Sequence, residues 1–171
     1  SQGICFVGEV AVRDFLKEYL PAERGLVLTA TGKRVGEHEG VALYTIGQRQ
    51  GLHIGGAKDA SGEPWFVCGK DMAKNRLIVV QGHDHPALLA PQLTALESHW
   101  ISGTAPTLNH PYAAKTRYRQ TDAPCHLTSI ENDTCTIKFD EAQWAVTPGQ
   151  SVVVYDGEIC LGGAIIEQGQ T

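Results

Sequence analysis

Near its N-terminus the chain carries one helical pattern of apolar and polar positions. Apolar side chains occupy positions 12, 15, 16, 19 and 20, and charged residues fill positions 13, 14, 17 and 18. This three-and-four spacing is typical of an amphipathic helix. Pro21 follows directly and ends the pattern, because proline lacks the amide hydrogen that the next turn needs. The spacing therefore predicts a helix over residues 12–20.

The rest of the pattern consists of short apolar or alternating stretches, which indicate β-strands. Residues 25–38 predict a hairpin that turns at Thr31-Gly32, and residues 63–82 predict a second hairpin that turns near Lys74-Asn75. Farther along, Asp156-Gly157 is a strong two-residue hairpin signal. The predicted strands in this later part are residues 92–101, 112–120, 125–130, 134–140, 151–155 and 159–167.

Short strands at regular spacing without helices are typical of a sandwich or a closed barrel. Turn residues at 81–86 mark a boundary between the two parts of the chain. We therefore expect a mainly β protein with two domains. A small α+β domain would span residues 1–81, and a six-stranded antiparallel β-barrel would span residues 82–171.

Composition and charge limit the kinds of partner and the compartment that we expect for the chain. The chain has 171 residues, of which 42% are hydrophobic and 19% charged. No apolar run approaches the roughly 18 residues of a membrane helix, so we expect no membrane partner. The formal net charge of −5 means that binding to a polyanion would need a local cationic patch. The five cysteines form no C-x-x-C pair and no zinc-ligand spacing, which favours a reducing, cytoplasmic compartment.

Three cysteines lie in apolar stretches. Cys68 and Cys160 fit small hydrophobic residues of strands. Cys5 lies in the opening sequence SQGICFVGEV, which has neither an initiator Met nor the pattern of a signal peptide. We expect the chain to be a piece of a larger protein. On the residues alone, Cys5 is either a buried packing residue or half of an active site.

Two motifs lack the pattern that their chemistry needs. The glycine-rich residues 44–56 do not contain G-x-x-x-x-G-K-[ST], and no helix pattern follows them, so we interpret them as a glycine-shaped loop with Arg49 exposed. His83 and His85 could offer two imidazoles to a metal, with His99 or His110 as a third ligand. They lie in a turn without a carboxylate cluster, and we expect no metal site in this chain.

A cationic segment follows in the sequence KTRYRQ. An ideal strand would place Lys115, Arg117 and Arg119 on one face, roughly 7 Å apart, with Tyr118 on the other. Neighbouring cations repel one another, and a nucleic acid would relieve that repulsion while an aromatic ring stacks on a base. An ordinary solvated strand face remains the alternative.

Seven blocks of the sequence together resemble the tRNA-specific 2-thiouridylase family, and they keep the family's order over nearly the whole chain. They are GICF at 3–6, GEH at 36–38, YTIGQR at 44–49, QGHDHP at 81–86, KTRYRQ at 115–120, VTPGQ at 146–150 and CLGG at 160–163.

The resemblance implies the C-terminal part of such an enzyme, which comprises a central domain and a β-barrel. Family members begin with an ATP-pyrophosphatase domain that carries an S-G-G-x-D-S phosphate loop and a first catalytic cysteine, and this sequence contains neither. The implied cofactor, ATP, would be bound by that N-terminal domain. We expect the 171-residue chain alone to be inactive.

The resemblance also implies the reaction and its residues. ATP adenylates the C2 oxygen of the wobble uridine, and a persulfide on Cys5 delivers the sulfur, with the first cysteine as a later disulfide partner. The implied partners are the Lys, Glu and Gln tRNAs, a cysteine desulfurase and sulfur-relay proteins. The implied tRNA contacts are Arg117, Tyr118 and Gln150, to which the spacing adds Lys115 and Arg119.

Two other functions remain open at this point. A stand-alone RNA-binding β-barrel would keep the cationic segment but leave Cys5 without a catalytic role. A small metal-dependent barrel enzyme would use the histidine cluster.

Overall fold

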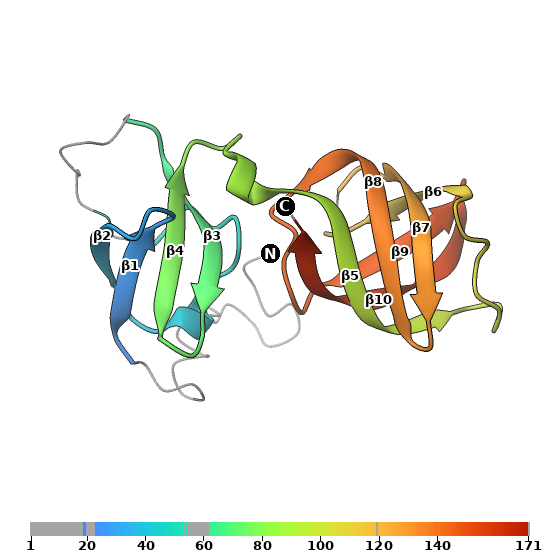
Figure 1. Ribbon diagram of the computed structural model, residues 1–171, viewed down its shortest axis with the longest axis horizontal. Helices are drawn as coiled ribbons and strands as arrows, with labels where there is room; N and C mark the ends of the chain where they lie inside the picture. The colour runs from blue at the N-terminus through green and yellow to red at the C-terminus, as the bar shows by residue number, and fades with distance from the viewer. Residues whose placement is uncertain (1–18, 20–22, 53, 55–61, 119, 171) are drawn as a thin grey trace, which may run out of the picture. The chain divides into compact units, whose positions relative to one another are not determined.

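The computed structural model describes residues 19, 23–52, 54, 62–118 and 120–170. The chain divides into two compact units, Ser1–His83 and Asp84–Thr171, and the described part of each is built mainly of strands (Figure 1). The helix expected over residues 12–20 lies outside the described residues except for Tyr19, whose backbone is helical.

The first unit contains one four-stranded sheet with the strand order β2-β1-β4-β3. Both predicted hairpins are confirmed, because β1 pairs antiparallel with β2 and β3 pairs antiparallel with β4. The two hairpins join through a parallel pairing of β1 with β4. The elements are β1 (Gly25–Thr29), β2 (Arg34–His38), the 3₁₀ turn η1 (Val41–Leu43), β3 (Trp65–Asp71) and β4 (Arg76–Gln81).

The core of this unit lies against one face of the sheet. Its strand residues are mostly valine, whose branched side chain suits a pleated, buried surface. The glycine-rich segment after η1 contributes Tyr44 and Leu52, which are 2% and 4% exposed. The cluster comprises Val27, Val41, Tyr44, Leu52, Val67, Leu77 and Val79.

His38, at the end of β2, is buried as a neutral imidazole. Its Nδ1 accepts a hydrogen bond of 3.0 Å from the Gly40 amide, so Nε2 must carry the proton and donate to the Asn75 carbonyl at 3.2 Å. A Cβ on Gly25 would lie 2.1 Å from that carbonyl oxygen, so only glycine fits beside this hydrogen bond. Desolvation by burial lowers the pKa of His38 from its ordinary value.

We expect the first unit to lose stability in mild acid through His38. A histidine whose pKa is lowered by folding stabilises the fold fully above its unfolded pKa of about 6.5, and this contribution falls as the pH drops below that value. Urea unfolding at about pH 5 and about pH 7.5 should therefore give a lower midpoint in acid. His38→Gln should reduce this difference, and the exposed control His99→Gln should leave it unchanged. An equal pH dependence in wild type and His38→Gln would contradict the assignment.

The second unit contains a closed barrel of six strands, all paired antiparallel, in the order β10-β5-β8-β7-β6-β9 (Figure 1). The expectation of a mainly β protein with a six-stranded antiparallel barrel is confirmed. The turn between β9 and β10 lies at Asp156-Gly157, as predicted. The elements are the 3₁₀ turn η2 (Pro86–Leu88), β5 (Leu89–Trp100), β6 (Pro111–Lys115), β7 (Ala123–Glu131), β8 (Thr134–Trp144), β9 (Ser151–Asp156) and β10 (Ile159–Gln170).

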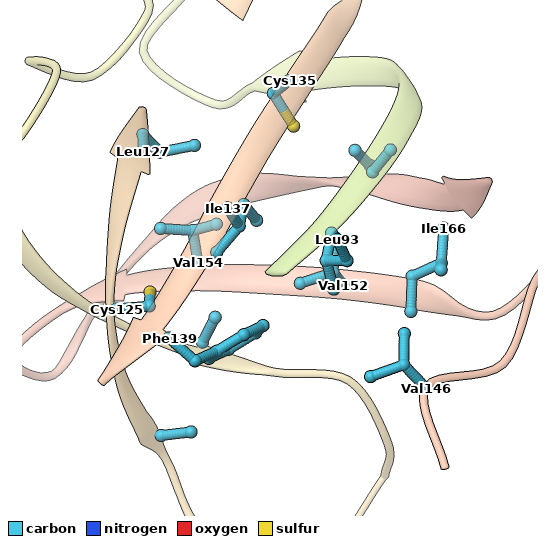
Figure 2. Packing of buried hydrophobic residues seen from close by; sticks show 14 of the residues in the cluster. Leu93, Cys125, Leu127, Cys135, Ile137, Phe139, Val146, Val152, Val154 and Ile166 are labelled. Carbon is cyan, nitrogen blue, oxygen red and sulfur yellow. The ribbon is translucent and has the colours of Figure 1, made fainter. Parts of the chain in front are cut away.

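The barrel interior is filled by apolar side chains from every strand. Along β9, Val152 and Val154 point inward and are fully buried, and Ser151 is exposed, which follows the two-residue period of a strand. Figure 2 shows the packing of the larger members of this core: Leu93, Cys125, Leu127, Cys135, Ile137, Phe139, Val146, Val152, Val154 and Ile166. Such a barrel is a rigid support for residues on its loops.

The four described cysteines differ in burial. Cys125 and Cys135 lie in the barrel core, where burial raises the pKa of their thiols to about 12 and about 11. Cys68 on β3 is half-buried, and burial raises its pKa to about 11. Cys160 lies on strand β10, as predicted, but it is not buried as a hydrophobic strand residue would be. This cysteine is exposed, because it lies beside the β9–β10 turn, where the strand pairing shifts register before Gly162.

Candidate nucleic-acid interface

The expected cationic strand face is not formed by Lys115 and Arg117. Strand β6 ends at Lys115, and the chain bends through residues 116–118, so Arg117 is not on a strand. The Lys115 ammonium lies 2.8 Å from the Asp122 carboxylate, which raises the pKa of that lysine. It also lies 5.4 Å from the centre of the Tyr155 ring. Arg119 lies outside the described residues. The predicted strip was therefore wrong where the structure describes it.

Arg117 instead points toward the end of β8. Its Nη2 donates to the Ala145 carbonyl at 2.9 Å and to the Thr147 hydroxyl at 3.3 Å. The guanidinium also lies over the Trp144 ring, 5.3 Å from the ring centre. Partial burial lowers the pKa of Arg117, but an arginine remains a cation at neutral pH. The side chain thus bridges the β6–β7 connection and the turn after β8.

A series of side-chain amide hydrogen bonds also joins the β6–β7 connection to the last residues of β8. The Gln120 Oε1 accepts from both the amide and the hydroxyl of Thr116, at 3.2 and 2.9 Å. The Gln120 Nε2 then donates to the Gln143 Oε1 at 2.7 Å, and the Gln143 Nε2 donates to the Glu141 carbonyl at 2.8 Å. Thr116 and Gln143 are buried, so these hydrogen bonds are shielded from water. They tie Thr116 and Gln120 to the end of β8.

These bridges support two exposed side chains of the predicted site. Tyr118 is 92% exposed and follows Arg117 directly in the chain. Gln150 is exposed at the end of the turn at residues 147–150, in which Thr147 is buried. The backbone amide of Gln150 donates to the Thr147 carbonyl at 3.2 Å. Gly149 has a φ of +81°, which favours glycine. The arrangement displays an aromatic ring and a carboxamide on fixed backbone.

The described part of the glycine-rich segment packs against β3, and its Gly47 amide is used in that contact. The Gly47 amide donates to the Val67 carbonyl, and the Val67 amide donates to the Gln48 carbonyl. The Gln48 side chain accepts from the Thr45 amide. Arg49 is exposed, as expected. Residues 53 and 55–56 of this segment lie outside the described residues.

His83 and His85, in the boundary turn, contact other protein groups. The His83 ring meets the Phe66 ring edge-on, with the ring centres 5.8 Å apart. The His85 Nδ1 accepts from the Ala87 amide at 3.1 Å and caps the turn η2, which begins at Pro86. Among the described residues, no group of three or more His, Cys, Asp and Glu side chains is placed to hold a metal ion.

Cys5, the predicted catalytic residue, lies outside the described residues. Conversely, sequence reasoning missed the residues that hold the surface together: Thr116, Gln120, Gln143, Trp144, Ala145 and Thr147. Three of them lie inside the KTRYRQ and VTPGQ blocks. The order of the blocks gave no signal that these two segments, about 30 residues apart, are bonded to each other.

No helix in the described part of the chain is both long and apolar enough to cross a membrane.

Each half of the chain matches a known family model. Residues 13–81 match the family model for the tRNA methyl transferase PRC-barrel domain, and residues 91–166 match the model for the aminomethyltransferase beta-barrel domain. The chain is 61% identical to the tRNA-specific 2-thiouridylase MnmA of Nitrosomonas europaea over 97% of its own length and 46% of that relative.

Two further relatives carry the same name. The identity is 58% for the protein of Thiobacillus denitrificans, with 97% of this chain and 46% of the relative covered. It is 56% for the protein of Cupriavidus necator, with 98% and 46% covered. The chain thus spans a little under half the length of these relatives, and it matches their C-terminal part. Over the region that they share, the chain belongs to the tRNA-specific 2-thiouridylase family.

Proposed function

We propose that this chain is part of an enzyme that replaces the C2 oxygen of the wobble uridine of tRNA with sulfur, in the cytoplasm. The observation that carries the proposal is an identity of 55–61% over nearly the whole chain to proteins named tRNA-specific 2-thiouridylases. In this proposal the second unit contributes to tRNA binding, and Cys5 carries the sulfur.

The barrel is suited to a folded, partly single-stranded RNA. Bases in loops are unstacked, and proteins bind them by stacking aromatic rings on them and by hydrogen bonds to their edges. Tyr118 offers an exposed ring, and Gln150 offers both donors and an acceptor. Because the chain as a whole is acidic, we propose that tRNA is held by such local contacts and not by a broad cationic face.

Cys5 is suited to the sulfur transfer by its chemistry. A thiolate accepts a sulfur atom from a donor persulfide by thiol exchange and then holds it as the terminal atom of its own persulfide. That terminal sulfur would form the new bond to C2 of the uridine as the activated C2 oxygen leaves. The thiolate of the family's first cysteine would then attack the Cys5 sulfur, so that the S–S bond breaks, a disulfide forms between the two cysteines and the transferred sulfur stays on C2 as a thiocarbonyl. A cysteine desulfurase with relay proteins would supply the sulfur. The proposed substrates are the tRNAs for Lys, Glu and Gln.

The described residues do not fit ATP, the cofactor that the family implies. The Gly47 amide in the glycine-rich segment is bonded to β3, and the described residues that come after it include no α-helix to present free amides to a phosphate. We therefore assign ATP binding to a part of the enzyme other than the described residues.

The proposal is tested by the 2-thiouridine content of cellular tRNA. Deleting the gene for the full-length protein should remove 2-thiouridine from the Lys, Glu and Gln tRNAs, as measured by mass spectrometry of digested nucleosides. A plasmid copy of the full-length gene should restore it, and one encoding these 171 residues alone should not. An unchanged 2-thiouridine content after deletion would contradict the proposal and favour a stand-alone RNA-binding barrel.

A further inference from the structure

We propose that Arg117 is a positioning residue, which holds Tyr118 and Gln150 on one RNA-contact surface and does not bind phosphate itself. The inference rests on the proposed function of the second unit and concerns how its surface is assembled. It changes the expectation drawn from the sequence, in which Arg117 was one of a row of phosphate-binding cations.

The contacts of the guanidinium support this role. It lies over the Trp144 ring and donates to two oxygens of the turn after β8, those of Ala145 and Thr147. Arginine is suited to such a site, because its flat group can stack on an aromatic ring while its N–H groups form directed hydrogen bonds. The side chain is half-buried, so part of its charge is withdrawn from any ligand that approaches from solvent.

The turn bonded to Arg117 contains a backbone conformation that needs stabilising contacts. Ala145 has a φ of +50°, a left-handed conformation that is unfavourable for a residue with a Cβ. Such a conformation persists where surrounding contacts fix it. Here the Ala145 amide donates to the Leu88 carbonyl, and the Ala145 carbonyl accepts from both Arg117 and Thr147. Without Arg117 one of these constraints is lost.

A continuous path of bonds links the two exposed residues. Tyr118 is the chain neighbour of Arg117, Arg117 bonds the Thr147 hydroxyl, and the Thr147 carbonyl accepts from the Gln150 amide. The position of one exposed side chain relative to the other therefore depends on the Arg117 contacts. Loss of Arg117 should weaken RNA binding by misplacing Tyr118 and Gln150, without removing a phosphate contact.

The test is tRNA binding by the full-length enzyme across a salt series, with wild type, Arg117→Ala, Arg117→Lys, Tyr118→Ala and the double variant Arg117→Ala/Tyr118→Ala. We expect Arg117→Ala to weaken binding about 5- to 160-fold, the range for loss of one base stack, with an unchanged log–log salt slope. Arg117→Lys should bind as weakly as Arg117→Ala. An ammonium lacks the flat group that lies over the Trp144 ring and cannot reproduce the two directed hydrogen bonds of the guanidinium. The double variant should bind more weakly than Tyr118→Ala by no more than the Gln150 contribution, because the Tyr118 stack is already lost and the two effects are then less than additive.

Two control variants separate the loss of an Arg117 hydrogen bond from the loss of a positive charge. Thr147→Val keeps the charge and the shape of the buried side chain but removes an acceptor of Arg117 at 3.3 Å, and it should weaken binding in part with the slope unchanged. Lys115→Ala removes one positive charge next to the same segment without touching the Arg117 contacts. Lys115→Ala therefore measures how the loss of one charge alone changes the log–log salt slope of tRNA binding.

Two results would overturn the inference. One is a salt slope lowered by about 0.7 to 0.9 in Arg117→Ala, which marks a lost phosphate contact. The other is full additivity of the Arg117→Ala and Tyr118→Ala effects. Failure of the proposed function gives a different result, because Tyr118→Ala itself would then leave tRNA binding unchanged.

Discussion

Replacement of Cys5 by serine in the full-length enzyme is expected to abolish 2-thiouridine formation while tRNA affinity stays close to that of wild type. Serine removes the atom that forms the persulfide, since an alcohol oxygen cannot hold and pass on a sulfur atom under these conditions. It removes little contact area. The measurement is a single-turnover assay of 2-thiouridine by mass spectrometry, together with a tRNA binding curve for the same preparation.

Cys160→Ser is the matched control for this experiment. Burial raises the pKa of Cys68, Cys125 and Cys135 to about 11 or 12, so these thiols are protonated at neutral pH and are poor sulfur acceptors. Cys160 is the exposed cysteine of the described residues, and it should be replaceable without loss of thiolation. Thiolation that persists in Cys5→Ser, or that disappears in Cys160→Ser, would place the sulfur carrier elsewhere.

Tyr118→Ala is expected to weaken tRNA binding by about 1–3 kcal/mol, the cost of removing one base-stacking ring. The ring is 92% exposed, so its removal leaves no cavity and should not lower the free energy of unfolding. Because a base stack involves no phosphate contact, the salt slope should stay the same. Tyr118→Phe keeps the aromatic face and should bind nearly as well as wild type.

Gln150→Ala provides the comparison for this effect. Its carboxamide contributes hydrogen bonds alone, so its loss should cost about 0.5–1.5 kcal/mol of binding. A larger effect of Gln150→Ala than of Tyr118→Ala, or a Tyr118→Phe variant as weak as Tyr118→Ala, would contradict a stacking role for the ring.

The repeating patterns of the sequence were enough to predict the barrel. Alternation along β9 and the Asp156-Gly157 signal are local properties, and a local pattern fixes which side of a strand is buried. The segment KTRYRQ has the same alternation, but its strand ends at Lys115. The reason lies in side-chain bonds, from Thr116 to Gln120 and from Arg117 to Ala145, 28 residues away. Spacing along the chain contains no information about such partners.

The same limit explains why Cys160 lies on a strand as predicted but is exposed. The run Ile159-Cys160-Leu161 is apolar, and apolar runs are usually buried. Here it begins directly after a tight turn, and Ile159 is 66% exposed. His38 is the opposite case, a polar residue that sequence reasoning did not assign to the core. Its burial depends on Gly40 and Asn75, whose backbone groups satisfy both ring nitrogens.

The central claim is that the surface around Tyr118 contacts tRNA, and photocrosslinking tests it most directly. Tyr118 would be replaced in the full-length enzyme by a photoreactive phenylalanine analogue, and Ile159 would carry the same analogue as the control. In the pairing of β6 with β9, Lys115 lies opposite Val153 and Ala113 lies opposite Tyr155, so the β9–β10 turn with Ile159 is at the far end of this strand pair from Tyr118. We predict a crosslink to tRNA from position 118 that excess unlabelled tRNA removes, and none above background from position 159. Equal crosslinking from the two positions, or none from position 118, would contradict the account.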